Sequence, residues 1–384
     1  MTARERMRIA IAGGKPDRVP IAMVADFDFY CQAAGRPLWE FEYGDNESRA
    51  AIQRAARRRF PDNDFVYCWT GVSHQAAASR RVVEEEGQPF VEWVASGERT
   101  PIAPRPTAAV WHDRPGEGVT SQSGYEEPIT KESEIARVLG PVPSAQSLVK
   151  AGYYDPLAYL RRDLGDNAYL SVSAHAIVPN SIDALGGFER GLIAMHDNPR
   201  LARTVVEQMA LRRSAVIEAG AMQGADGAWI GGYLEGADLI SPALWREVAL
   251  PGHRIQVERA RACGLQTLFW FLGDCMPLLD DLVELGIDAL VVEQDRRGYS
   301  SDPAEIRRRV GTSLCVFGWN WELDFIHDRR DSITREVERQ IRAAGPDGAF
   351  VMGTTYMTSE VSLEALDHFC AEVVRVSREV GYGG

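Results

Sequence analysis

Short apolar runs separated by helix-length stretches dominate the chain from residue 155 onward. The runs show little alternation of polar and apolar residues, which is typical of strands buried on both faces of a parallel sheet. We expect strands at residues 169–173, 228–231, 266–271, 289–292, 314–317 and 349–352. This alternation of strands and helices favours an α/β fold, a (β/α)8 TIM-type barrel, over a doubly wound sheet.

The residues before 155 supply the remaining parts of such a barrel. The opening MTARERMRIAIAGG predicts an amphipathic helix that ends at Gly13-Gly14, which would form an N-terminal helical extension. Strands are expected at 21–24 and 65–69, with a helix at 47–59 between them.

An insertion is predicted after the second of these strands. Residues 80–103 alternate and contain a turn at Glu86-Gly87, which indicates a β-hairpin excursion from the barrel. Residues 111–127 are rich in Gly, Asp and Ser, and their length suits an active-site loop or lid. We therefore expect a single barrel domain over 1–384, with a hairpin and loop insertion at 80–127.

Charge and cysteine usage limit the classes of partner and compartment. The chain has 42 basic and 55 acidic residues, a net charge of -13, which argues against nucleic acid or an anionic membrane as a partner. No apolar run reaches the roughly 18 residues that a membrane span needs, and the N-terminus lacks the apolar core of a secretory signal. The six cysteines are scattered without CxxC spacing, so we expect free thiols in a cytoplasmic protein.

Several segments, taken in order, resemble one known family. The opening helix is followed by KPDRVP, and GGFE leads into NPRLARTVVEQM. Further along come EGADLISPALWREVALP, TLFWFLGDCMP, FGWNWELDF and AGPDGAFVMGTTYMTSEVSLEAL. The order and spacing of these segments resemble the uroporphyrinogen decarboxylase superfamily, which includes zinc- and corrinoid-dependent methyltransferases. The resemblance covers nearly the whole chain and implies a barrel fold.

The chain departs from both branches of that superfamily. Many methyltransferase members carry His-x-Cys-Gly at the strand end where this chain has Trp270, Leu272 and Gly273, and no third Cys stands near 353–355. Since neither tryptophan nor leucine binds zinc, we expect no zinc site of the family's kind. The decarboxylase signature Arg-Gln-Ala-Gly-Arg is replaced by CQAAGR at 31–36, and its Asp after Phe-Ser is absent at 69–71. The resemblance is therefore closer to the corrinoid-dependent methyltransferases.

Three residues at predicted strand ends are candidates for catalysis, because reactive groups of TIM barrels lie there. His175 suits a general acid or base, or equally a histidine hydrogen-bonded in the barrel mouth. Glu235 matches the family's Glu and suits a proton donor, with an exposed residue at a helix start as the alternative. Glu293 is followed by Asp295, and the two are either an acid–base device or carboxylates neutralised by Arg296-Arg297.

Other residues at strand ends suit the binding of a planar ring. We expect substrate contacts from five of them: Tyr233, Trp270, Trp319, Asn320 and Tyr356. Asp26, Phe27 and Asp28 follow the first strand and are interpreted as ordinary loop residues. Cys275 has no His or second Cys at a suitable local spacing, so its role as a replacement metal ligand has no support. The remaining histidines, among them His253, are interpreted as surface or loop residues.

Three functions follow in order of preference. The first is a methyltransferase or O-demethylase component that moves a methyl group from a small methoxylated, aromatic substrate to a corrinoid carried by a partner protein. The second is a metal-free decarboxylase or lyase that acts on a small acid. The third is a non-catalytic binding protein. The resemblance also implies a possible homodimer, since superfamily members often pair through barrel faces.

Overall fold

Eight parallel strands form the centre of the protein. This computed structural model describes residues 1–102, 125–293, 298–354 and 356–383. The strands lie in the order β1-β11-β10-β9-β8-β7-β6-β2. Their bounds are β1 (Ile21–Ala22), β2 (Phe65–Cys68), β6 (Tyr169–Ser173), β7 (Gly227–Tyr233), β8 (Gln266–Leu272), β9 (Ala289–Val292), β10 (Cys315–Phe317) and β11 (Phe350–Gly353). The predicted (β/α)8 barrel is confirmed.

The barrel is closed between β1 and β2 by side chains as well as by main chain. The Asp64 N–H donates to Ile21 O at 2.8 Å, and the Asp64 carboxylate accepts from Ile21 N at 2.9 Å. Asn63 Oδ1 accepts from Met23 N at 3.1 Å. The predicted strand at 21–24 is therefore too long, since β1 ends at Ala22. At Met23 and Val24 the main-chain N–H groups donate to side chains and not to a neighbouring strand, as Val24 N does to Thr354 Oγ1.

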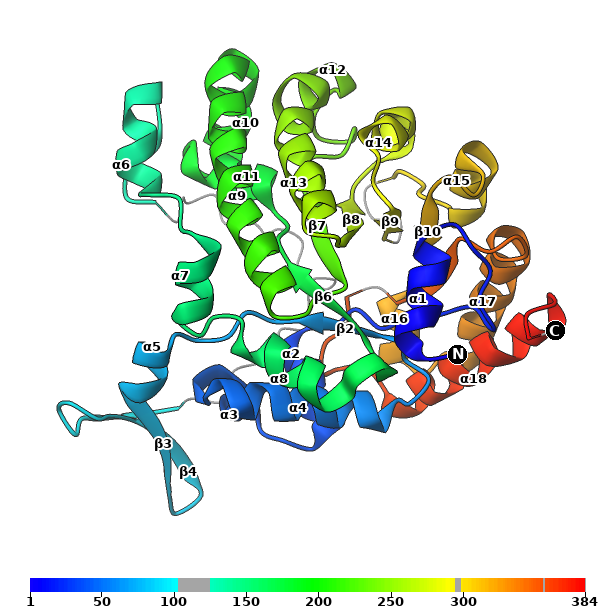
Figure 1. Cartoon of the computed structure of the whole chain (residues 1–384), viewed down its shortest axis with the longest axis horizontal. Coiled ribbons are helices and arrows are strands. Elements are labelled where there is room, and N and C mark those ends of the chain that lie inside the picture. The colour runs from blue at the N-terminus through cyan, green and yellow to red at the C-terminus, as the bar shows by residue number, and fades with distance from the viewer. Residues whose placement is uncertain (103–124, 294–297, 355, 384) are drawn as a thin grey trace.

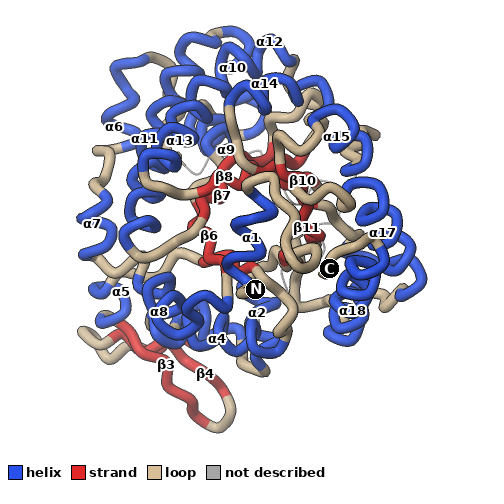
Figure 2. The backbone as a smooth tube through the Cα atoms, turned by 45° about the vertical axis from the view of Figure 1, so that its right-hand side comes forward, coloured by secondary structure: helices blue, strands red, loops and turns tan. Residues whose placement is uncertain are grey.

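Helices surround the strands on the outside, and Figures 1 and 2 show this ring. They are α1 (Ala3–Ile11), α2 (Phe27–Ala34), α3 (Leu38–Tyr43), α4 (Asn46–Arg59), α5 (His74–Ala78), α6 (Ile135–Leu139), α7 (Ala145–Lys150), α8 (Asp155–Leu164), α9 (Ile177–Ala184), α10 (Phe188–Asp197), α11 (Pro199–Met222), α12 (Pro242–Leu244), α13 (Leu250–Ala262), α14 (Leu279–Leu285), α15 (Pro303–Val310), α16 (Glu322–Ile326), α17 (Arg330–Ala344) and α18 (Leu363–Glu379). Among the described residues, no helix has the length and apolar character needed to cross a membrane.

Helix α1 covers the N-terminal end of the barrel, as Figure 2 shows. It begins at a capping box in which Thr2 and Glu5 each bond the other's main-chain N–H. Its buried residues Met7, Ala10 and Ile11 pack with the side chains that fill the barrel interior, such as Phe65. Because this end is closed, the carboxyl ends of the strands form the open mouth of the barrel.

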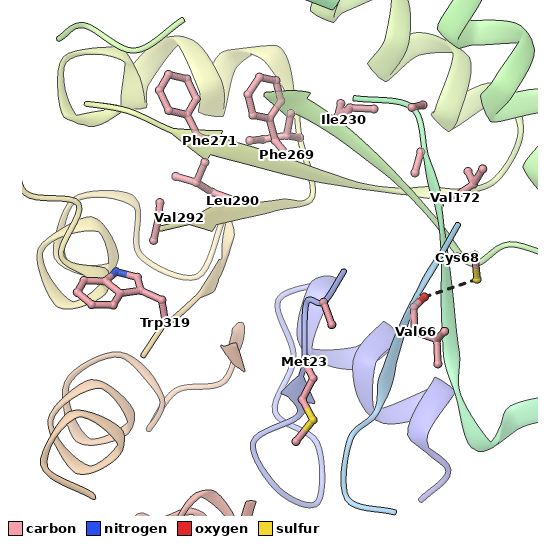
Figure 3. Packing of buried hydrophobic residues seen from close by; sticks show 14 of the residues in the cluster. Met23, Val66, Cys68, Val172, Ile230, Phe269, Phe271, Leu290, Val292 and Trp319 are labelled. Carbon is pink, nitrogen blue, oxygen red and sulfur yellow. Dashed lines mark hydrogen bonds between the residues drawn. The ribbon is translucent and has the colours of Figure 1, made fainter. Parts of the chain in front are cut away.

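Side chains from each strand alternate between the barrel interior and the layer of helices. In β8, Leu268 belongs to the interior cluster, whereas Phe269 and Phe271 belong to the larger cluster under the helices. Figure 3 shows this outer cluster, in which Phe269 and Phe271 lie with Val292 and Trp319. Both faces of the strands are therefore buried, which explains their continuous apolar runs.

The predicted hairpin projects from the barrel beside α3 and α5 (Figure 1). Strands β3 (Arg80–Glu85) and β4 (Gln88–Trp93) pair antiparallel across Glu86 and Gly87, whose φ angles are 51° and 83°. Two successive positive φ angles fit the tight turns that suit hairpins. A third strand, β5 (Arg99–Pro101), was not predicted. Most of the predicted lid at 111–127 lies outside the described residues.

Candidate functional site

Aromatic rings from several strands gather in the barrel interior beneath its mouth. The ring of Tyr67 on β2 lies 5.5 Å from that of Trp229 on β7 and 5.3 Å from that of Trp69, with near-perpendicular planes. Trp270 on β8 lies 6.4 Å from Trp229 and 6.1 Å from Tyr233. These contacts connect rings from β2, β7 and β8 into one cluster, in which Tyr67 and Trp229 are buried and Trp270 and Tyr233 are partly buried. Such a cluster suits a planar apolar ligand.

His175 lies within this aromatic cluster, just beyond the end of β6. Its ring is 5.5 Å from Trp270 in an edge-to-face contact. Tyr67 donates its hydroxyl proton to Ser173 Oγ at 2.6 Å, and Ser173 Oγ lies 2.9 Å from His175 Nδ1. When the Ser173 hydroxyl in turn donates to Nδ1, the neutral ring carries its proton on Nε2.

The environment keeps His175 uncharged. Burial lowers its pKa to about 3, and the positive charge of Arg213 on α11 adds to the effect. At neutral pH the imidazole is therefore neutral. The structure thus brings His175 into the mouth, and its assignment as a catalytic residue stays a prediction.

Trp270 and Glu293 form a pair at the ends of β8 and β9. Trp270 Nε1 donates to Glu293 Oε1 at 3.0 Å, and the Glu293 side chain is buried. This bond fixes the indole plane between His175 and Tyr233. Residues 294–297, on which the predicted neutralisation of Glu293 and Asp295 depends, lie outside the described part of the chain.

Glu235 points into the wall behind the mouth. Its carboxylate Oε2 lies 2.6 Å from His253 Nε2 on α13, and both side chains have no exposed surface. The expectation that His253 is a surface or loop residue is therefore wrong, because α13 packs this face of its helix against the barrel. Gln256, which contacts His253 Nδ1 at 3.3 Å, donates to Ala174 O at 2.7 Å. This chain of contacts supports the main chain next to His175.

The other predicted binding residues divide between the mouth and the helix layer. Tyr233 and Tyr356 pack partly buried near the interior rings. Trp319 belongs to the outer cluster (Figure 3), and its main chain bonds Gln340 on α17. Asn320 is fully buried, with Nδ2 3.5 Å from Ile333 O of the same helix. Trp319 and Asn320 therefore make their hydrogen bonds to α17. Substrate contact by Tyr233, Tyr356, Trp319 and Asn320 stays a prediction.

Asp26, interpreted from the sequence as an ordinary loop residue, is the N-cap of α2. It follows β1, and its N–H donates to Met357 O at 2.8 Å while its carboxylate caps α2 at Phe27 N. Burial raises the pKa of Asp26 to about 6, opposed by the Phe27 N–H and assisted by repulsion from Asp28. Its charge in turn contributes, after burial, to the raised pKa of Tyr356. In the sequence, only the position of Asp26 just after the first strand pointed to a place at the strand ends.

The described residues do not offer a zinc site. They contain no group of three His, Cys, Asp or Glu side chains arranged to hold a metal. Cys275 is buried beside Ser301, with 3.7 Å between Sγ and Oγ, and burial raises the pKa of its thiol to about 12. A protonated thiol is a poor zinc ligand, and Trp270 and Leu272 are not ligands at all.

Comparisons with solved structures identify proteins of the same fold. A methyltransferase from Methanosarcina mazei aligns over 97% of this chain and 98% of its own, with 16% identity and a TM-score of 0.68. A B12-independent methionine synthase from Shewanella sp. W3-18-1, in complex with selenomethionine, aligns over 94% of this chain and 98% of its own, with 9% identity and a TM-score of 0.50. At such identities the likeness concerns the fold alone.

Sequence comparison gives the family. No curated protein matches the chain. Residues 117–376, more than half of the chain, match the family model described as uroporphyrinogen decarboxylase (URO-D). The match agrees with the resemblance drawn from the ordered segments and with the barrel that the structure shows. The chain belongs to the uroporphyrinogen decarboxylase family.

Proposed function

We propose that the protein is a methyl-transferring enzyme that demethylates a small methoxylated aromatic compound. The observation that carries this proposal is the aromatic cluster beneath the mouth, in which a neutral His175 is held by the hydroxyls of Tyr67 and Ser173. A planar ring is bound best by faces and edges of other rings. A neutral imidazole with its proton on Nε2 is a hydrogen-bond donor for an ether oxygen.

The protein's own groups have separate tasks in this reaction. The methyl carbon leaves the ether oxygen, which keeps the electron pair of the broken bond and must be stabilised as it gains negative charge. His175 Nε2 donates a hydrogen bond to that oxygen. Asp26, whose pKa of about 6 leaves a protonated fraction near neutral pH, supplies the proton that completes the phenol. Trp270 and Tyr233 hold the ring.

The methyl acceptor is proposed to be a corrinoid on a partner protein. A reduced corrinoid supplies a nucleophilic cobalt that takes a methyl group. The open mouth presents rings and a neutral imidazole, which suits an acceptor brought from outside better than a resident metal. No step through zinc is proposed, because the described residues lack a ligand set. A homodimer and a cytoplasmic location stay predictions.

An assay of methoxyarenes with chemically reduced cobalamin tests the proposal. We expect release of the corresponding phenol that depends on the reduced corrinoid and on the enzyme. The variant His175→Phe, which keeps an aromatic ring but has no Nε2 donor, is expected to lose this activity, while Arg203→Met on the exposed face of α11 serves as a control. Release of CO2 from the acid without phenol formation would instead favour the decarboxylase alternative.

A further inference from the structure

A second cavity lies beside the mouth. It has a volume of about 340 Å³ and is lined by Phe27, Phe41, Glu42, Tyr43, Arg49 and Trp69. Trp69 connects it to the mouth, because the Trp69 ring packs against Tyr67, whose hydroxyl lies 3.2 Å from His175 Nδ1. The Trp69 ring is therefore shared between this cavity and the cluster of rings that contains His175.

Two arginines from distant parts of the sequence meet at this cavity. Arg49 on α4 and Arg80 at the start of β3 both donate to the main-chain oxygen of Glu42, at 2.9 and 3.3 Å. Their guanidinium groups stack on the rings of Phe41 and Tyr43, 5.0 and 5.3 Å from the ring centres. Arg49 lines the cavity itself, and Arg80, at the start of the hairpin, lies behind its wall against Tyr43 and the Glu42 main chain.

Within the described residues, neither arginine of this pair is bonded to a carboxylate. Each makes its hydrogen bonds to main-chain oxygens. The carboxylate of Glu42 attracts Arg49, but burial and repulsion from Arg80 outweigh it and lower the pKa of Arg49 to about 10. Both groups remain cations at neutral pH.

Hydrogen-bond donors are also in excess around the cavity. Arg49 Nε, Arg80 Nε and Trp69 Nε1 are buried and have no acceptor in the part of the chain that the structure describes. Buried donors without acceptors are costly, and a cluster of them is unusual. The missing chemical group is therefore an acceptor, and next to two cations a negatively charged one.

We propose that this cavity binds the carboxylate of the substrate, so that the proposed demethylation acts on methoxylated aromatic acids. The inference rests on the proposed function for the position of the ring and its methoxy group. Planar guanidinium groups recognise a carboxylate through paired, charge-assisted hydrogen bonds. The aromatic walls hold the adjoining ring. The acid group then orients the substrate with its methoxy group toward His175.

Binding of a matched pair of ligands tests the inference without any methyl transfer. The probes are para-methoxybenzoate and para-methoxybenzamide, which have the same shape and differ in charge. Titration calorimetry of the full-length protein gives both affinities. We expect the acid to bind more tightly by roughly tenfold to a hundredfold. The preference should disappear in Arg80→Met and shrink in Arg49→Lys, and Arg203→Met should keep it.

Each result decides the inference independently of catalysis. A preference for the acid that depends on Arg49 and Arg80 supports the carboxylate site even if the protein releases no phenol. Equal binding of the two probes, no binding of either, or a preference that both variants retain overturns it. Thermal unfolding of each variant checks the fold. Arg80→Met, which removes one main-chain hydrogen bond and one ring contact, is expected to fold even if Arg49→Lys does not.

Discussion

Replacing Asp26 by asparagine tests the electrostatics of the mouth directly. Burial raises the pKa of this carboxyl from 3.8 to about 6 in the folded protein. A raised pKa means that the folded protein holds the proton more tightly than the unfolded chain does. Ionisation of Asp26 therefore destabilises the fold, and wild-type stability falls as the pH rises from about 4 to about 6. Asparagine keeps the helix cap and removes the titration.

The size of the effect follows from the pKa difference. One pKa unit corresponds to about 1.4 kcal/mol, so a rise of about two corresponds to about 2–3 kcal/mol when partial exposure of Asp26 is taken into account. Relative to wild type, the free energy of unfolding of Asp26→Asn should increase by this amount between about pH 4 and pH 7 and then remain level.

Urea unfolding at a series of pH values measures this difference. Asp45→Asn, which replaces the exposed cap of α4, controls for the loss of a capping carboxylate itself. Parallel pH dependences for wild type and Asp26→Asn would refute the reasoning, because they would show that Asp26 titrates alike in the folded and unfolded chains. The same variant should also lower phenol release near neutral pH, since it cannot donate the proton.

The remaining predictions concern the residues around the mouth. His175→Asn should lower the rate of phenol release by roughly a hundredfold or more, because it removes the ring that acts on the substrate, and thermal unfolding would show how much its contacts with Ser173 and Trp270 contribute to stability. Trp270→Phe removes the donor to Glu293 Oε1 and should lower the free energy of unfolding by about 1–3 kcal/mol and weaken ligand binding, as urea unfolding and calorimetry would report. Glu235→Ala leaves His253 buried without its partner and should cost about 3–5 kcal/mol in the same unfolding assay. A Glu235→Ala protein as stable as wild type would contradict the buried pair.

The barrel could be predicted from the sequence because its strands are buried on both faces. The runs at 169–173 and 289–292 match β6 and β9 at both ends, since apolar character starts and stops where each strand does. The strand expected at 228–231 extends further, to Tyr233, because pairing with β8 continues to Leu272. The apolar pattern alone does not predict strand pairing at glycine or polar residues such as Gly232 and Tyr233.

The site was harder to predict because its contacts join distant residues. The position of His175 after a strand indicated the mouth, but its hydroxyl partners and its neutral state depend on Tyr67, 108 residues away. Glu235 was expected in contact with substrate or solvent, and only the packing of α13 reveals His253 beside it. Likewise, only the structure shows that Arg49 and Arg80 both donate to the carbonyl oxygen of Glu42 and so lie side by side.

A single-turnover reaction with labelled para-methoxybenzoate and reduced corrinoid tests the central claim most directly. The methyl carbon and the ether oxygen carry different isotopic labels, and mass spectrometry follows both. The account predicts a phenol that keeps the labelled oxygen, with the labelled methyl group recovered on the corrinoid and no reaction when the corrinoid is omitted. Loss of the oxygen label, phenol release without corrinoid, or release of CO2 alone would contradict methyl transfer at the mouth of this barrel.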